Sequence, residues 1–223
     1  RAGGERHRVL PAGRLGGVVS STATTALHAR RSSEVPSSAP VALVVVSLAN
    51  LVLLVRVSAY SAVVAPAILP TLLPVLGGAL AAGVAAVAVV YARAERGTRL
   101  AMPAARNPAE IGMALRFGAF YALVLFVAAW LEDEIGARGL YLATALSGLA
   151  DVDSGALSAL NLFGESRVSA LTAVAAIAVA IASNMLFKLG IPAWLGKGLF
   201  WRTLAPFGAA LAGGAAGFLL VAA

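Results

Sequence analysis

Long apolar runs alternate along the chain with short clusters of charged residues and prolines. A helix needs ~20 mostly apolar residues to cross a bilayer. Runs of that length cover residues 41–64, 69–92, 111–131, 139–163, 168–189 and 199–222. A weaker run over 9–28 contains Arg14 and predicts a short or partial span. The pattern predicts an all-α polytopic transmembrane helix bundle, with six full spans plus the short or partial amino-terminal one.

Composition indicates that lipid rather than water surrounds these helices. Apolar residues make up 60% of the 223 residues and charged residues 12%, whereas soluble domains carry about 25% charged residues. A soluble helical domain would also need polar outer faces, and residues 168–187 offer almost none. We therefore expect a basic tail over 1–8 and a single transmembrane domain over 9–223, in contact with the lipid bilayer.

The charged and reactive residues exclude several classes of function. The net charge is +7, but the arginines lie at the ends of apolar runs, where anionic headgroups explain them better than nucleic acid does. The chain has no cysteine, and its histidines are His7 and His28, so no thiolate metal site or cysteine nucleophile is expected. It contains no phosphate-binding loop or dinucleotide fingerprint. We expect neither an enzyme nor a bound cofactor.

Two acids in the stretch "GLADVDSG", Asp151 and Asp153, interrupt an otherwise apolar run. A charge at the centre of a membrane helix costs about 2.5–3.5 kcal/mol, so such residues face a partner or a wet cavity. On a regular helix the two side chains point about 200° apart. Both reach one site only if the helix is broken, and Gly148 and Gly155 bracket the pair.

Broken helices that combine free carbonyls with carboxylates hold cations in many transporters. Hard oxygen ligands suit Na⁺, H⁺ or a partly hydrated Mg²⁺, so Asp151 and Asp153 are the candidate metal ligands. The structural alternative is that Asp151 pairs with Arg56, Arg116 or Lys188 and only locks helices together. Lys188 is itself expected to extend to the membrane surface.

The two halves of the chain show a weak repeat. When residues 17–29 are set beneath 148–160, Ser20 falls on Asp151 and Thr22 on Asp153. The repeats cover about 9–92 and 111–222. Because one helix, 111–131, lies between the halves, we expect parallel repeats related by an axis along the membrane normal.

Further polar side chains recur in the two halves. The hydroxyls of "SSTATT" either bond back to their own helix or line a cavity opposite the two acids. One asparagine in each half is expected to hydrogen-bond across helices. The residues expected to form the ion-binding site or polar cavity are Asp151, Asp153, Ser147, Ser154, Ser20, Ser21, Thr22, Thr24, Thr25, Asn50 and Asn184.

Three motifs are characteristic: "GGVVSSTATTALHARRS", "NPAEIGMALRFGAF" and "GLYLATALSGLADVDSGALS". Together they resemble the domain of unknown function that follows the MgtC domain in the MgtC/SapB family of bacterial membrane proteins. The resemblance implies a multi-pass protein of the bacterial inner membrane, linked to ion physiology. It also implies an MgtC-type domain or a second copy of the chain as a partner.

Two functions remain open from the sequence. The first is a small-cation (Mg²⁺, Na⁺ or H⁺) transporter or channel-like protein with a polar site at the membrane midplane. The second is a non-transporting regulatory or scaffold module that binds another membrane protein. A water-accessible cavity that reaches Asp151 would distinguish the first from the second.

Overall fold

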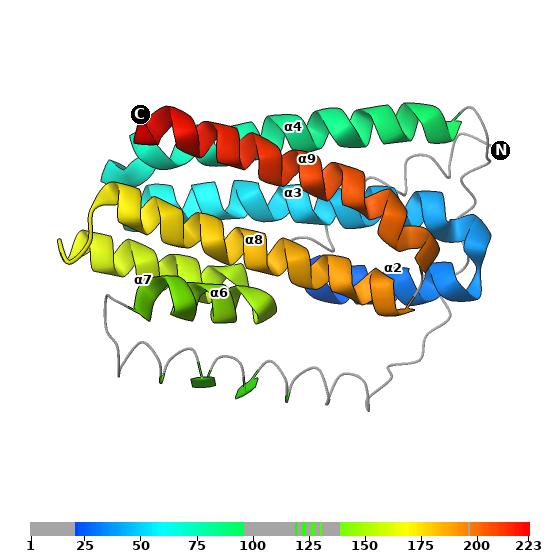
Figure 1. Ribbon diagram of the computed structural model, residues 1–223, viewed down its shortest axis with the longest axis horizontal. Helices are drawn as coiled ribbons and strands as arrows, with labels where there is room; N and C mark the ends of the chain where they lie inside the picture. Colours follow the sequence, from blue (N-terminus) through cyan, green and yellow to red (C-terminus); the bar gives the residue numbers. More distant parts are fainter. Residues whose placement is uncertain are drawn as a thin grey trace. The chain divides into compact units, whose positions relative to one another are not determined.

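A computed structural model describes residues 21–95, 139–195 and 197–223, with isolated positions between 119 and 130. These residues form α-helices and two short 3₁₀ helices, and no strand occurs among them (Figure 1). The all-helical fold predicted from the sequence is confirmed. In chain order the elements are α2 (Ser21–Glu34), η1 (Pro36–Ser38), α3 (Ala39–Val64), η2 (Pro66–Ile68), α4 (Leu69–Glu95), α6 (Leu140–Ala150), α7 (Val152–Gly164), α8 (Ala170–Leu195) and α9 (Lys197–Ala222).

Four of these helices are long and apolar enough to cross a bilayer. The candidate spans are Pro36–Val64, Pro66–Arg93, Ala170–Trp194 and Gly198–Ala222. They coincide with four of the predicted apolar runs. The chain is therefore a membrane protein. The basic tail 1–8, most of the run 111–131 and the first part of the run 9–28 lie outside the described residues.

Prolines set the boundaries of the central helices. Pro36 begins η1, directly before α3, where its missing N–H costs no hydrogen bond. Ala65 ends α3 in a non-helical conformation, φ −144° and ψ 70°, because a residue that precedes a proline is disfavoured in the helical region. Pro66 then begins η2 and leads into α4. The turn between two apolar helices is therefore fixed by local chemistry.

The chain divides into two compact units, which are described separately. Among the described residues, the first unit holds 21–59, 72–95, 187–195 and 197–223. The second holds 60–71, 139–186 and the isolated positions between 119 and 130. The first unit therefore contains α2, most of α3 and α4, the end of α8, and α9. The second contains α6, α7 and most of α8.

In the first unit, α4 and α9 pack backbone to backbone through glycines (Figure 1). A methyl group at Gly78 would collide with the Gly213 carbonyl, and one at Gly217 would collide with the Pro74 carbonyl. Pro74 of α4 therefore meets Gly217 of α9, and the later residue Gly78 meets the earlier residue Gly213. The two helices are antiparallel. These helices end the two predicted repeats, and the expectation that they run in the same direction is wrong.

Apolar side chains from all the helices of the first unit form its core. Ala29 of α2, Leu43 of α3 and Leu199 of α9 pack together, and Val90 of α4 and Ile191 of α8 cover them. Because residues far apart in sequence meet here, α2 is held near the beginnings of α3 and α9 and the ends of α4 and α8.

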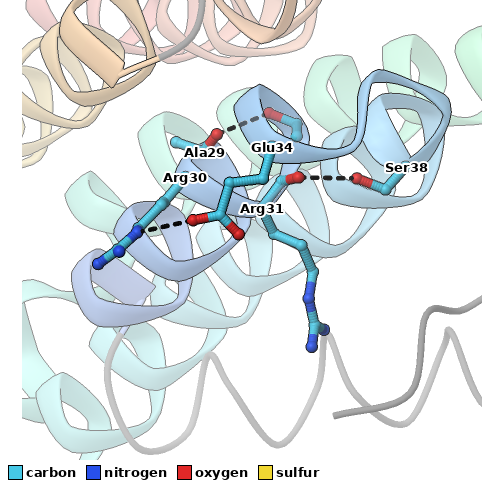
Figure 2. A network of polar contacts seen from close by, with 6 residues as sticks. Ala29, Arg30, Arg31, Glu34 and Ser38 are labelled. Carbon is cyan, nitrogen blue, oxygen red and sulfur yellow. Dashed lines mark hydrogen bonds and ion pairs between the residues drawn. The ribbon is translucent and has the colours of Figure 1, made fainter. Parts of the chain in front are cut away.

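The carboxyl end of α2 is polar, in contrast to its packed face. Arg30 and Glu34 form an exposed ion pair 3.0 Å long (Figure 2). Beyond the helix end, the Ser38 hydroxyl donates to the Val35 carbonyl at 2.7 Å and lies 3.4 Å from that of Arg31. These bonds fix the turn that leads from α2 into α3.

In the second unit, α6 and α7 form a helical hairpin (Figure 1). A methyl group at Gly155 would collide with the Ser147 hydroxyl and come within 3.3 Å of the Thr144 Cα. In one continuous helix residues 144 and 155 would be about 16 Å apart along the axis, so the chain folds back at Asp151. The expectation that 139–163 forms one full span, broken at the acids, is therefore wrong in its direction: the chain reverses at the break, and Gly155 permits the close contact.

Candidate functional site

Asp151 is the single residue between α6 and α7. Its backbone is extended, with φ −152° and ψ 136°. Its N–H donates to the Ser147 carbonyl at 2.7 Å, which closes the last turn of α6. Its side chain makes no capping hydrogen bond to α7, although it occupies the N-cap position. The predicted break in this run is confirmed, and it lies at the first of the two acids.

The second acid, Asp153, lies in the first turn of α7. A helix amino terminus carries partial positive charge, which favours carboxylates at both positions. The hydroxyl of Ser147 donates to the Thr144 carbonyl at 3.2 Å, and that of Ser154 lies 3.4 Å from the Asp151 carbonyl. The hairpin thus brings these four predicted residues, Ser147, Asp151, Asp153 and Ser154, to one turn.

Helix α8 lies against the end of α6 and hydrogen-bonds to its carbonyls. The Asn184 amide donates from Nδ2 to the Gly148 carbonyl at 2.7 Å. One residue earlier, the Ser183 hydroxyl donates to the Ala145 carbonyl at 2.6 Å. Gly148 allows this contact, because a methyl group there would collide with the carbonyl of Ala180. The predicted cross-helix role of Asn184 is confirmed.

The oxygen of the Asn184 amide is the most informative atom of this site. The side chain is 2% exposed, and Oδ1 has no hydrogen-bond partner among the described residues. A buried polar atom without a partner costs about 1–3 kcal/mol, so this oxygen is suited to accept a proton donor or to ligate a cation. Because Nδ2 is held by Gly148, the amide lies within one helical turn of Asp151.

The donor set consists of oxygens. Asp151 and Asp153 belong to the α6–α7 turn, and the Asn184 amide is hydrogen-bonded to a backbone carbonyl at the end of α6. No group of three or more His, Cys, Asp or Glu residues in the described part of the chain is placed to hold a metal ion. A cation bound here would rely on neutral oxygens beside the acids, as hard cations accept.

A second polar cluster lies in the first unit, around Lys188. Its Nζ donates to the Ser21 hydroxyl at 2.7 Å and to Asn50 Oδ1 at 2.9 Å. The Lys188 residue is 1% exposed. The expectation that it extends to the membrane surface is therefore wrong, because two oxygens from α2 and α3 hold its ammonium inside. The predicted cross-helix role of Asn50 is confirmed.

Two of the "SSTATT" hydroxyls have different partners, one on their own helix and one on another helix. Thr25 bonds back to the Ser21 carbonyl at 2.8 Å, whereas the Ser21 hydroxyl accepts from another helix. Thr22 is buried and Thr24 half-buried on α2, and Ser20 lies outside the described residues. That these hydroxyls face the two acids stays a prediction, since the two clusters belong to separate units.

Two contributors were missed by sequence reasoning. Ser183 adjoins Asn184, and a serine and an asparagine in succession on an apolar helix indicate a polar face. Lys188 was recognised as a charge, but its spacing of four residues from Asn184 places both on one face of α8. That spacing was the available signal for a buried role.

Comparison with known proteins places the chain among relatives of undefined activity. Residues 1–196 match the domain described as "Domain of unknown function (DUF4010)". The chain belongs to the DUF4010 family. An uncharacterized protein of Aquifex aeolicus (strain VF5) is 31% identical over 85 residues, which cover 38% of this chain and 37% of that protein.

No solved structure matches the chain. The match to the Aquifex aeolicus protein covers just over a third of that protein's length. DUF4010 membership agrees with the resemblance to a domain of unknown function. The activity has to be argued from the site itself.

Proposed function

We propose that this DUF4010 protein is a small-cation transporter or channel-like protein, and that its cation binds at the α6–α7 turn. The observation that carries the proposal is the buried Asn184 Oδ1, which is held beside a broken helix by the bond from Nδ2 to the Gly148 carbonyl. The carboxylates of Asp151 and Asp153 supply negative charge at the same turn. Na⁺, H⁺ and Mg²⁺ are the candidate ions, because small hard cations bind to carboxylate, amide and carbonyl oxygens.

The hairpin gives the proposed site its place in the membrane. Helix α6 has 11 residues and α7 has 13, so their lengths of about 16 and 20 Å fall short of a bilayer core of ~30 Å. We infer that the hairpin enters and leaves the membrane on the same side, with Asp151 at its tip. Irregular backbone at membrane depth is tolerated where it lines a water-filled cavity.

We also propose that the two halves are inverted repeats. The alignment of Gly17 with Gly148 shifts the chain by 131 residues, and the same shift carries α3 onto α8 at both ends. The antiparallel contact of α4 with α9 requires opposite directions. Inverted repeats with discontinuous helices at their interface are a recurrent transporter architecture.

The wider setting follows from the family resemblance. We place the protein in the bacterial inner membrane as a multi-pass protein, with an MgtC-type domain or a second copy of the chain as its partner. The function of that partner is open, and the transport site as proposed lies within one copy.

A non-transporting scaffold module is the alternative, and two contacts favour it. The hydroxyls of Ser147 and Ser154 both lie against carbonyls of their own helices, and acids at a helix amino terminus are stabilised without any ligand. In this reading the turn is dry and its polar groups serve only packing.

Ion flux distinguishes the two functions. Purified protein in liposomes is loaded with gradients of Mg²⁺, Na⁺, K⁺ or H⁺, and the flux is compared with that of empty liposomes. We expect saturable flux of one small cation, and its loss in Asp151→Asn, which keeps the shape of the side chain but removes its charge.

The matched control is Glu165→Gln, which removes one exposed carboxylate just after α7. This control should transport like the original chain, and both variants should elute as folded protein. If no cation gives flux above empty liposomes, or if Asp151→Asn transports normally, the transporter proposal is wrong.

A further inference from the structure

The buried ammonium of Lys188 hydrogen-bonds to residues outside the α6–α7 turn. It lies in the first unit together with its two oxygen partners, Ser21 and Asn50. These partners are 6% and 2% exposed. The three side chains come from α2, α3 and α8, and the chain separates Lys188 from its partners by 167 and 138 residues. The cluster is thus a tertiary centre and not a local helix contact.

Two neutral oxygens hold the ammonium of this centre. An ammonium group is a compact cation with three N–H donors, and two of them go to a hydroxyl and an amide oxygen at 2.7 and 2.9 Å. Hydroxyl and amide oxygens are also ligands of free hard cations. Whatever occupies the position of Nζ must therefore be small, positively charged and able to bind both oxygens.

Packing alone does not explain a lysine at this position. A buried charge costs several kcal/mol, and well-packed apolar residues often serve stability equally well or better. A lysine is favoured where the two oxygens have to be held by a positive charge.

We propose that Ser21 Oγ and Asn50 Oδ1 form a binding site for a small monovalent cation, and that Lys188 fills it with a cation tethered to the chain. Removal of the tether should leave a site for a free primary ammonium ion. The inference does not rest on the proposed function, because its test involves no ion movement.

Chemical rescue of Lys188→Ala tests this inference. The purified variant is unfolded by heat in detergent with increasing methylammonium chloride, or with tetramethylammonium chloride at the same ionic strength. We expect a midpoint below that of the original chain, which methylammonium raises in a saturable manner, because binding to the folded state stabilises it. Tetramethylammonium carries the same charge but no N–H donor and should not raise the midpoint.

Two further variants show whether the cation binds at this site. Lys188→Met fills the space of the side chain and should not respond to methylammonium. Lys188→Ala combined with Asn50→Leu lacks the amide oxygen and should lose most of the response. The inference is overturned if methylammonium raises the midpoint of Lys188→Ala no more than that of the original chain, or if the double variant keeps the full response.

If Lys188→Ala does not survive purification in plain buffer, the yield of folded protein tests the same inference. Extraction with methylammonium present should then restore a monodisperse protein, and extraction with tetramethylammonium should not. Equal yields in the two salts would overturn the inference. Because this readout contains no transport step, failure of the transporter proposal leaves the result unaffected.

Discussion

The two polar centres of this DUF4010 protein are built alike but carry opposite charges. Each combines an asparagine from a long apolar helix with a polar side chain from a second helix or its end. In the first unit, Asn50 and Ser21 surround the ammonium of Lys188. In the second, Asn184 lies beside a helix break that carries Asp151 and Asp153.

This difference indicates what each centre can bind. The first centre has its cation supplied by the chain, so its amide oxygen is already used. In the second, the amide nitrogen is used and the amide oxygen has no partner among the residues described. A free cation is therefore expected at the second centre, whereas the first should hold one only when Lys188 is removed.

The comparison predicts its largest effect on stability at Asn50. Asn50→Leu removes an oxygen that accepts a hydrogen bond from a buried ammonium, and a hydrogen bond to a charged group is worth about 1.5–3 kcal/mol. We expect a loss of that size in the free energy of unfolding, measured by denaturant titration in mixed micelles. Asn161→Leu, at an exposed position of α7, is the control and should change it little.

A smaller loss is expected at Asn184. Asn184→Leu removes the bond to the Gly148 carbonyl but also removes the unpartnered oxygen, so the two effects partly cancel. Cross-helix hydrogen bonds in membranes average about 0.6 kcal/mol, and we expect a loss of about 1 kcal/mol or less in the same titration. A loss equal to that of Asn50→Leu would show that the two centres do not differ as proposed.

The smallest effect is predicted for Ser183. Ser183→Ala removes the single bond to the Ala145 carbonyl, which should cost about 0.6 kcal/mol. Ser58→Ala, which removes only a bond back to its own helix at Leu54, is the matched control. If both changes are neutral, the bond from α8 to α6 contributes nothing measurable to the second centre.

The long helices were predictable from sequence because apolar length alone decides whether a helix can span a membrane. The hairpin was not predicted, because α6 and α7 together are as apolar and as long as one span. Only the spacing of Asp151 and Asp153 indicated a break, and it indicated no reversal. This error carried over to the repeat. The parallel arrangement was derived by counting 139–163 as one crossing, and the proposed hairpin, which enters and leaves on the same side, removes that crossing and reverses the later helices.

The candidate site was predicted in part for a similar reason. Asp151, Asp153 and Asn184 stand out against an apolar background, so their importance could be inferred residue by residue. The bond of Asn184 to Gly148 and that of Lys188 to Ser21 join residues 36 and 167 positions apart. Such pairings depend on tertiary packing, which periodicity does not reveal.

Access of water and cations to the α6–α7 turn tests the central claim most directly. The chain has no cysteine, so Ser154→Cys introduces a single thiol beside Asp151 at a half-buried position. We expect this thiol, in liposomes, to react with a small water-soluble thiol reagent. The transported cation should slow the reaction, and this protection should disappear when Asp151→Asn is added. A folded protein whose thiol does not react, or whose reaction no cation slows, would show a dry, packed turn and contradict the account.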